Sequence, residues 1–182
     1  MMKADKTRQY SLDIGQGFRD YLTRRMEEKR VCGEVVMVVP RPTEAVLVMT
    51  KAFYPEGVYR LPSGGIHRGE QVEDALNREL LEETGFALPV DRFLARLDYL
   101  LRCENREISF SSYMYLMQPT DETPRCSDAE EQITGFRDVP IAQLAVIAEQ
   151  LRSLPGRWQD WGRFRAIAHG YVAKSPLLLG GG

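Results

Sequence analysis

One segment, residues 63–86, constrains this chain more than any other part of its sequence. We predict a glycine-rich loop at 63–70 and then a helix at 71–84, which Gly85 closes as a C-terminal stop. At about 100° per residue, three acids share one face of this helix: Glu79, Glu82 and Glu83. The apolar residues Val72, Ala75 and Leu76 lie on the same face. The inward face of the helix therefore begins apolar and ends in three carboxylates.

Three carboxylates on an inward face need compensating charge, because they repel one another and lose their hydration. A divalent cation supplies that charge. Oxygen ligands, with no cysteine or histidine among them, select a hard ion, which we expect to be Mg²⁺, with Mn²⁺ as a substitute. The alternative is a solvated acidic helix surface. The apolar residues on the same face and the preceding glycines favour the metal site.

The spacing of this segment resembles the Nudix box, G-x5-E-x7-R-E-U-x-E-E-x-G-U, where U is apolar. All nine fixed positions match over 23 residues: Gly64, Glu70, Arg78, Glu79, Leu80, Glu82, Glu83, Gly85 and Phe86. The resemblance implies an α/β protein, a Nudix-type α/β/α sandwich with a mixed β-sheet.

The resemblance also implies roles for individual residues. Glu79, Glu82 and Glu83 are expected as metal ligands, with the carbonyl of Ser63 as a further ligand at a position where glycine is common. Arg78 is expected to orient the acids with Glu70 as its partner. The backbone at Gly64 and Gly65 is expected to approach the cofactor closely. The expected catalytic set is Glu70, Arg78, Glu79, Glu82 and Glu83.

The general base is left open between a box glutamate, with Glu79 near the attacking water, and an acid from a later loop. Three acids precede the last predicted strand: Asp128, Glu130 and Glu131. A solvated loop explains those three equally well. We interpret His67 as a surface histidine. Residues 156–165 mix aromatics with arginines, which could stack a base and hold phosphate, although packing against the core or a second subunit is favoured.

The implied activity is a Mg²⁺-dependent pyrophosphatase. It would hydrolyse a phosphoanhydride bond in a nucleoside diphosphate linked to another moiety, or in a nucleoside triphosphate. Alternatives are a non-catalytic nucleotide-sensing domain of this fold and an isomerase of the isopentenyl-diphosphate type. The intact box argues against both. The proline that marks ADP-ribose enzymes is replaced by Arg102, so the substrate is not predicted.

The rest of the chain reads as strands and helices around this segment. We predict three parts: an N-terminal helical extension at 1–30, a hydrolase domain at 31–155, and a C-terminal helical extension and tail at 156–182. Strands at 32–39 and 45–53 are expected to pair as a hairpin. Further elements are an amphipathic helix at 13–30, strands at 92–103, 107–117 and 133–139, and helices at 141–154 and 158–174.

Composition limits the partners and the compartment. The length of 182 residues suits one domain. A net charge of −2 gives no indication of a nucleic-acid or membrane partner, so we expect a small nucleotide-like diphosphate substrate. Three scattered cysteines and no apolar leader predict a cytoplasmic protein without a zinc site. The helix at 13–30 is our candidate for homodimer contacts.

Overall fold

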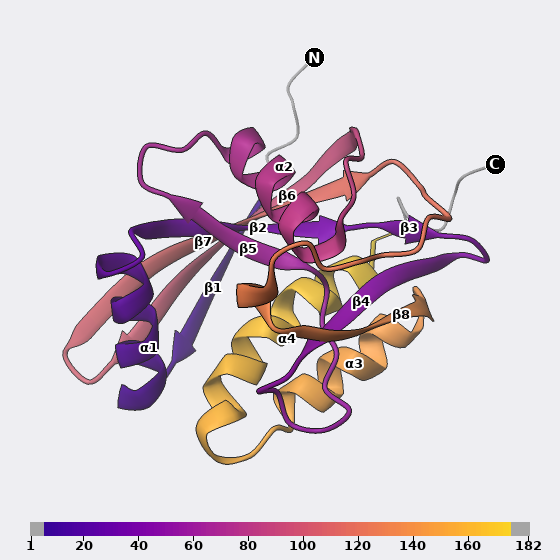
Figure 1. The fold of residues 1–182 in the computed structure, drawn as a ribbon. Coiled ribbons are helices and arrows are strands. Elements are labelled where there is room, and N and C mark those ends of the chain that lie inside the picture. The colour runs from indigo at the N-terminus through magenta and orange to yellow at the C-terminus, as the bar shows by residue number, and fades with distance from the viewer. Residues whose placement is uncertain (1–5, 176–182) are drawn as a thin grey trace.

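A computed structural model describes residues 6–175 as one mixed α/β unit (Figure 1). The order of elements is β1 (Thr7–Asp13), α1 (Gln16–Glu27), β2 (Val31–Val38), β3 (Pro40–Arg41), β4 (Ala45–Lys51), β5 (Ser63–His67), α2 (Val72–Thr84), β6 (Val90–Cys103), β7 (Arg106–Met117), β8 (Ile133–Pro140), α3 (Gln143–Arg152) and α4 (Gln159–Ala173). Two short 3₁₀ turns, η1 (Ala129–Glu131) and η2 (Gly156–Trp158), precede β8 and α4. In this part of the chain no helix is long and apolar enough to cross a membrane.

The strands form two sheets. The larger has the order β1-β6-β7-β2-β5, and the smaller has the order β3-β4-β8. The β1–β6 and β2–β7 pairs are parallel, whereas β6–β7 and β2–β5 are antiparallel. The predicted mixed sheet is therefore confirmed.

Strand β2 is covered on both faces, which explains its nearly continuous apolar sequence. Val35 and Met37 join a core cluster with Ala75, Leu76 and Leu80 of α2. Their neighbours Val36 and Val38 belong to a second cluster that includes residues of α3 and α4. Helices consequently lie on both sides of the strands (Figure 1), as the α/β/α prediction requires.

The predicted hairpin of residues 32–39 with 45–53 is wrong. Both edges of β2 are occupied, by β5 on one side and β7 on the other. Strand β4 therefore pairs with the two residues of β3 and with β8 in the smaller sheet.

The start of the glycine-rich stretch is a strand instead of a loop. Residues 63–67 form β5, antiparallel to β2, with Gly64 opposite Val35 and Gly65 opposite Glu34. This ladder satisfies backbone groups that a buried loop would leave unpaired.

The N-terminal region contains a strand as well as the predicted helix. Strand β1 runs parallel to β6 at the edge of the larger sheet, and Tyr10 and Leu12 pack on the core from alternate positions of the strand. Helix α1 follows and buries Phe18 and Leu22, four residues apart. Residues 6–30 therefore belong to the larger sheet and its core, and the predicted division into extensions and a hydrolase domain stays a prediction.

Helix α4 is likewise part of the core. It buries Trp161, Phe164 and Val172. Its His169 accepts a hydrogen bond at Nε2 from the backbone N–H of Leu61 at 2.9 Å, and burial lowers the pKa of His169 to about 4. The imidazole is therefore a neutral structural acceptor. The glycines at 180–182 lie outside the described residues.

The α3–α4 contact gives a stability test. A Cβ added at Gly162 would lie 2.0 Å from the carbonyl oxygen of Leu151, so Gly162→Ala should lower the free energy of unfolding by about 1–3 kcal/mol through overpacking. Gly17→Ala in α1 is the control, because no atom lies within 4 Å of its added Cβ; it should be neutral or stabilise by up to about 1 kcal/mol. Urea denaturation measures both, and equal effects would contradict the packing assignment.

Candidate functional site

Helix α2 is held so that its acids face inward. Ala75, Leu76 and Leu80 are buried beneath it, and Gly85 ends it at a φ of 74° while donating its N–H to the carbonyl of Leu81. This anchoring buries Glu79 at 6% exposure and Glu83 at 0%.

Strand β5 passes so close to α2 that only glycine fits at position 64. A Cβ there would lie 1.8 Å from Cδ of Glu79. The carboxyl group of Glu79 therefore occupies the space that a side chain on Gly64 would need. This contact explains a glycine that lies in a strand, where glycine is otherwise unfavourable.

The guanidinium of Arg78 joins the acids to β5. Its Nε and Nη2 donate to the two carboxylate oxygens of Glu70, each at 2.9 Å. Its Nη1 donates to Glu79 at 2.8 Å and to Glu82 at 3.1 Å, and Nη2 also donates to the carbonyl of Gly65 at 2.8 Å. The predicted pairing of Arg78 with Glu70 is confirmed.

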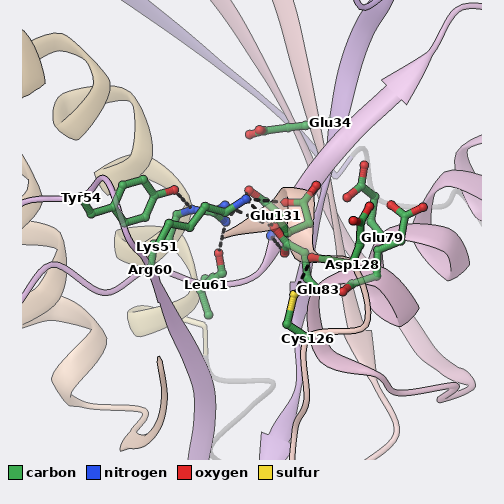
Figure 2. Close-up of polar contacts among 12 residues, drawn as sticks. Glu34, Lys51, Tyr54, Arg60, Leu61, Glu79, Glu83, Cys126, Asp128 and Glu131 are labelled. Atoms are coloured by element: carbon green, nitrogen blue, oxygen red, sulfur yellow. Dashed lines mark hydrogen bonds and ion pairs between the residues drawn. The ribbon is translucent and has the colours of Figure 1, made fainter. Parts of the chain in front are cut away.

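Three carboxylates from two elements converge beside Arg78. Oxygens of Glu79, Glu82 and Glu131 lie within 4.8 Å of one another. Glu131 comes from η1, and Lys51 of β4 holds it through an ion pair of 2.5 Å (Figure 2). Of the three loop acids considered from the sequence, Glu131 is the one that reaches this cluster.

Glu83 lies behind the cluster, in contact with cations. It accepts the backbone N–H of Ser63 at 2.9 Å and pairs with Arg60 at 3.4 Å and with Lys51 at 3.5 Å. Burial is the main cause that raises the pKa of Glu83. The assignment of Glu83 and of the Ser63 carbonyl as metal ligands stays a prediction.

The acidic cluster carries more negative charge than its neighbours compensate. The pKa of Glu79 is raised to about 7, mainly by burial; nearby Glu83 and Glu131 also act to raise it, whereas Arg78 acts to lower it. An uncompensated group of carboxylates with oxygen donors only fits a hard divalent cation.

The remaining predicted residues lie around this cluster. The carboxylate of Asp128 caps η1 by accepting the N–H of Glu130 at 2.9 Å. His67 is half-exposed, 3.5 Å from Glu70.

A cleft of about 1020 Å³ opens beside the acids. Its walls come from α1, from the chain between β4 and β5, from η1 and from the start of α4. Phe53, Tyr54 and Trp158 line it, whereas Trp161 also packs into the core. The aromatic segment therefore serves both interpretations made from the sequence, packing and cleft lining.

The sequence analysis missed the cations that support the site. Arg60 donates to the hydroxyls of Tyr54 and Ser63 as well as to Glu83 (Figure 2). Arg165 of α4 donates to Glu34 at 2.7 Å and to the Ser63 hydroxyl at 3.0 Å. No local motif marks these residues, because each acts across the fold.

Residues 33–161 match the NUDIX domain. The chain is 30% identical over 112 residues to the 8-oxo-dGDP phosphatase NUDT18 of Mus musculus, covering 59% of this chain and 32% of that protein. It is 32% identical over 87 residues to the protein named MutT4 of Mycobacterium tuberculosis (strain CDC 1551 / Oshkosh), covering 48% of this chain and 34% of that protein. The chain thus spans about a third of the length of these curated relatives.

A solved structure, the MutT protein of Bacillus halodurans, superposes with a TM-score of 0.55 at 14% identity. The match covers 78% of this chain and 82% of that one. At this identity the likeness shows the fold.

The pKa of Glu79 predicts how stability depends on pH when metal is removed. Because folding raises this pKa from 4.5 to about 7, the protonated form stabilises the fold below about pH 4.5, and this contribution is lost as pH rises through about 7. In chelator, the unfolding temperature of the wild type should therefore fall more steeply between about pH 5 and pH 8 than that of Glu79→Gln. Parallel curves would show that Glu79 ionises normally.

Proposed function

Because the chain belongs to the NUDIX domain family, we propose that it is a divalent-metal-dependent hydrolase of a nucleotide phosphoanhydride bond. The substrate class is a nucleoside diphosphate linked to another moiety, or a nucleoside triphosphate. The convergence of Glu79, Glu82 and Glu131 at one end of a large cleft carries this proposal. The name of the mouse relative, an 8-oxo-dGDP phosphatase, supports a nucleoside diphosphate derivative.

The proposed cofactor is Mg²⁺, with Mn²⁺ as a substitute. Its direct ligands would be Glu79, Glu82 and Glu131, which offer carboxylate oxygens within reach of one ion. Glu83 and the Ser63 carbonyl are further ligands in this proposal, since Glu83 already contacts the backbone of Ser63. When bound, the ion lowers the pKa of a water molecule and neutralises charge on the phosphoryl oxygens.

The protein groups around the ligands would hold them in position. Arg78 fixes the carboxylates of Glu79 and Glu82 against β5, and Lys51 fixes Glu131 from the opposite side. Such neighbours restrict ligand orientation and so favour one coordination geometry.

Two carboxylates are suited to accept the proton of the attacking water. Glu79 contributes a carboxylate oxygen to the cluster where the metal and its water would lie. Glu131 approaches the cluster from η1, outside α2. The cleft lining also offers aromatic faces for a base: Phe53 is 50% exposed, and Cζ of Arg157 lies 5.3 Å from the ring centroid of Trp158.

Substitution of the acids tests the proposed activity. Nucleoside di- and triphosphates, nucleotide sugars and dinucleotides are screened with Mg²⁺ or Mn²⁺, and released phosphate and pyrophosphate are measured. Glu82→Gln and Glu131→Gln should each lower turnover by about 10²–10⁴-fold, and Glu83→Gln should do so if it is also a ligand. Glu73→Gln is the control, because Glu73 is exposed on α2 away from the cluster.

Wild-type turnover that does not depend on a divalent ion, or unchanged turnover in Glu82→Gln and Glu131→Gln, would contradict the proposal. The pH–rate profile separates the two candidate bases. Turnover should fall at low pH as the base becomes protonated. In the residual activity of the variants, only substitution of the true base removes this fall.

A cytoplasmic location and a homodimer are further parts of the proposal. The odd number of cysteines supports the first. Sedimentation equilibrium tests the second, for which we expect the mass of two chains. The mass of a single chain at all concentrations would contradict it.

A further inference from the structure

The cleft is basic apart from its acidic end. Its lining contains eight Lys and Arg residues and five Asp and Glu residues, although the whole chain carries a net charge of −2. The cations are Arg24, Arg25, Lys29, Lys51, Arg60, Arg78, Arg157 and Arg165. Carboxylates pair with Lys51, Arg60, Arg78 and Arg165, so the excess positive charge of the lining comes from Arg24, Arg25, Lys29 and Arg157, which form no ion pair within residues 6–175.

Helix α1 and the residues just after it supply one basic wall. Arg24, Arg25 and Lys29 all line the cleft, yet none of them forms an ion pair of 4 Å or less within residues 6–175. All three precede the part of the chain that matches the NUDIX domain. Interaction with the C-terminal dipole of α1 explains a basic residue there, but it does not explain why the residues line the cleft.

Arg25 reaches from α1 to the strand that carries the site. A Cβ at Gly65 would lie 3.2 Å from Nη2 of Arg25, and the carbonyl of the same Gly65 accepts a hydrogen bond from Arg78. Nη1 of Arg25 lies 3.5 Å from the hydroxyl of Tyr21, one turn earlier in α1. The Arg25 guanidinium therefore lies against the face of β5 opposite the one that Glu79 covers, within the same cleft and without an ion pair in the described residues.

Arg165 adds a second cation from α4. Its Nη1 bonds Glu34 and Ser63, but its Nε is buried and has no hydrogen-bond partner in the described part of the chain. The residue is 8% exposed and lines the cleft. The Arg165 guanidinium therefore adds positive charge beside the cleft, whereas its buried Nε is an unsatisfied donor inside the packed protein.

The direction of the pKa shift of Tyr21 agrees with arginines lying near its hydroxyl. Burial acts to raise the pKa of Tyr21, but Arg25, Arg165 and Arg60 outweigh it and the net pKa is lowered. Nearby positive charge lowers a tyrosine pKa in this way, so the direction agrees with the position of the three arginines around the Tyr21 hydroxyl.

We propose that Tyr21, Arg25 and Arg165 bind a phosphate group of the substrate that is separate from the metal-bound pyrophosphate bond. This proposal rests on the proposed function, because it assumes that the chain hydrolyses a nucleotide. Arginine offers paired donors that match phosphate geometry, and the Tyr21 hydroxyl adds a neutral donor. The preferred substrate therefore carries a further phosphate, either at the end of its polyphosphate chain or on its ribose.

Anion binding in the absence of metal tests this site independently of catalysis. Inorganic phosphate is titrated calorimetrically into the protein in chelator. Arg25→Gln should weaken binding about tenfold or more, and Tyr21→Phe should weaken it less. Arg19→Gln is the matched control on the same helix, because Arg19 pairs with Asp20 and does not line the cleft. Unchanged phosphate binding in Arg25→Gln, with its fold verified by thermal denaturation, would overturn the site.

Kinetics with Mg²⁺ distinguish the position of the phosphate. A nucleoside triphosphate and a 3′-phosphorylated nucleoside 5′-diphosphate are each compared with the plain diphosphate. The compound whose extra phosphate reaches the site should have a lower KM than the plain diphosphate. In Arg25→Gln this difference in KM should shrink about tenfold or more, and in Arg19→Gln it should persist. An advantage that survives in Arg25→Gln for both compounds would overturn the assignment.

The two proposals fail separately. If no nucleotide is hydrolysed but Arg25→Gln loses phosphate binding, the anion site stands and the hydrolase proposal falls. If nucleotides are hydrolysed while Arg25→Gln behaves as the wild type in both assays, the hydrolase stands and the anion site falls.

Discussion

The contact between Arg78 and its three carboxylates determines how the site is built. A single guanidinium holds Glu70 by two hydrogen bonds, reaches Glu79 and Glu82 and bonds the backbone of β5. It fixes the distance between strand and helix, which is so short that position 64 must be glycine. The acids stay undercompensated, because three cations, Arg78, Lys51 and Arg60, face five carboxylates: Glu70, Glu79, Glu82, Glu83 and Glu131. A cation-binding site follows from this imbalance.

Buried cations behind the acidic cluster connect the site to the rest of the fold. Lys51 and Arg60 contact Glu83 (Figure 2). Arg165 joins Glu34 to Ser63. Desolvation offsets much of the attraction within buried pairs, so these contacts contribute more to position than to stability. Through them α4 is connected to β2 and β5, and a change in α4 can alter the site without touching the acids.

Local patterns predicted the parts of the site that depend on neighbours in sequence. The spacing of the acids along α2, the left-handed Gly85 and the partner of Arg78 all lie within one short segment. Strand β1 and the partners of β4 could not be predicted, because strand pairing is decided by which edges remain free. The same holds for Arg165, which bonds Glu34 across 131 positions. Glu131 was one of three acids in a loop, and only the fold distinguishes it.

The central claim is that carboxylates from α2 and η1 bind one hard cation. Crystals grown with Mn²⁺ and measured at its absorption edge test this directly. We expect an anomalous peak within about 2.0–2.4 Å of carboxylate oxygens from Glu79, Glu82 and Glu131. A fully occupied Mn²⁺ peak elsewhere, with these three side chains turned away from one another, would contradict the account.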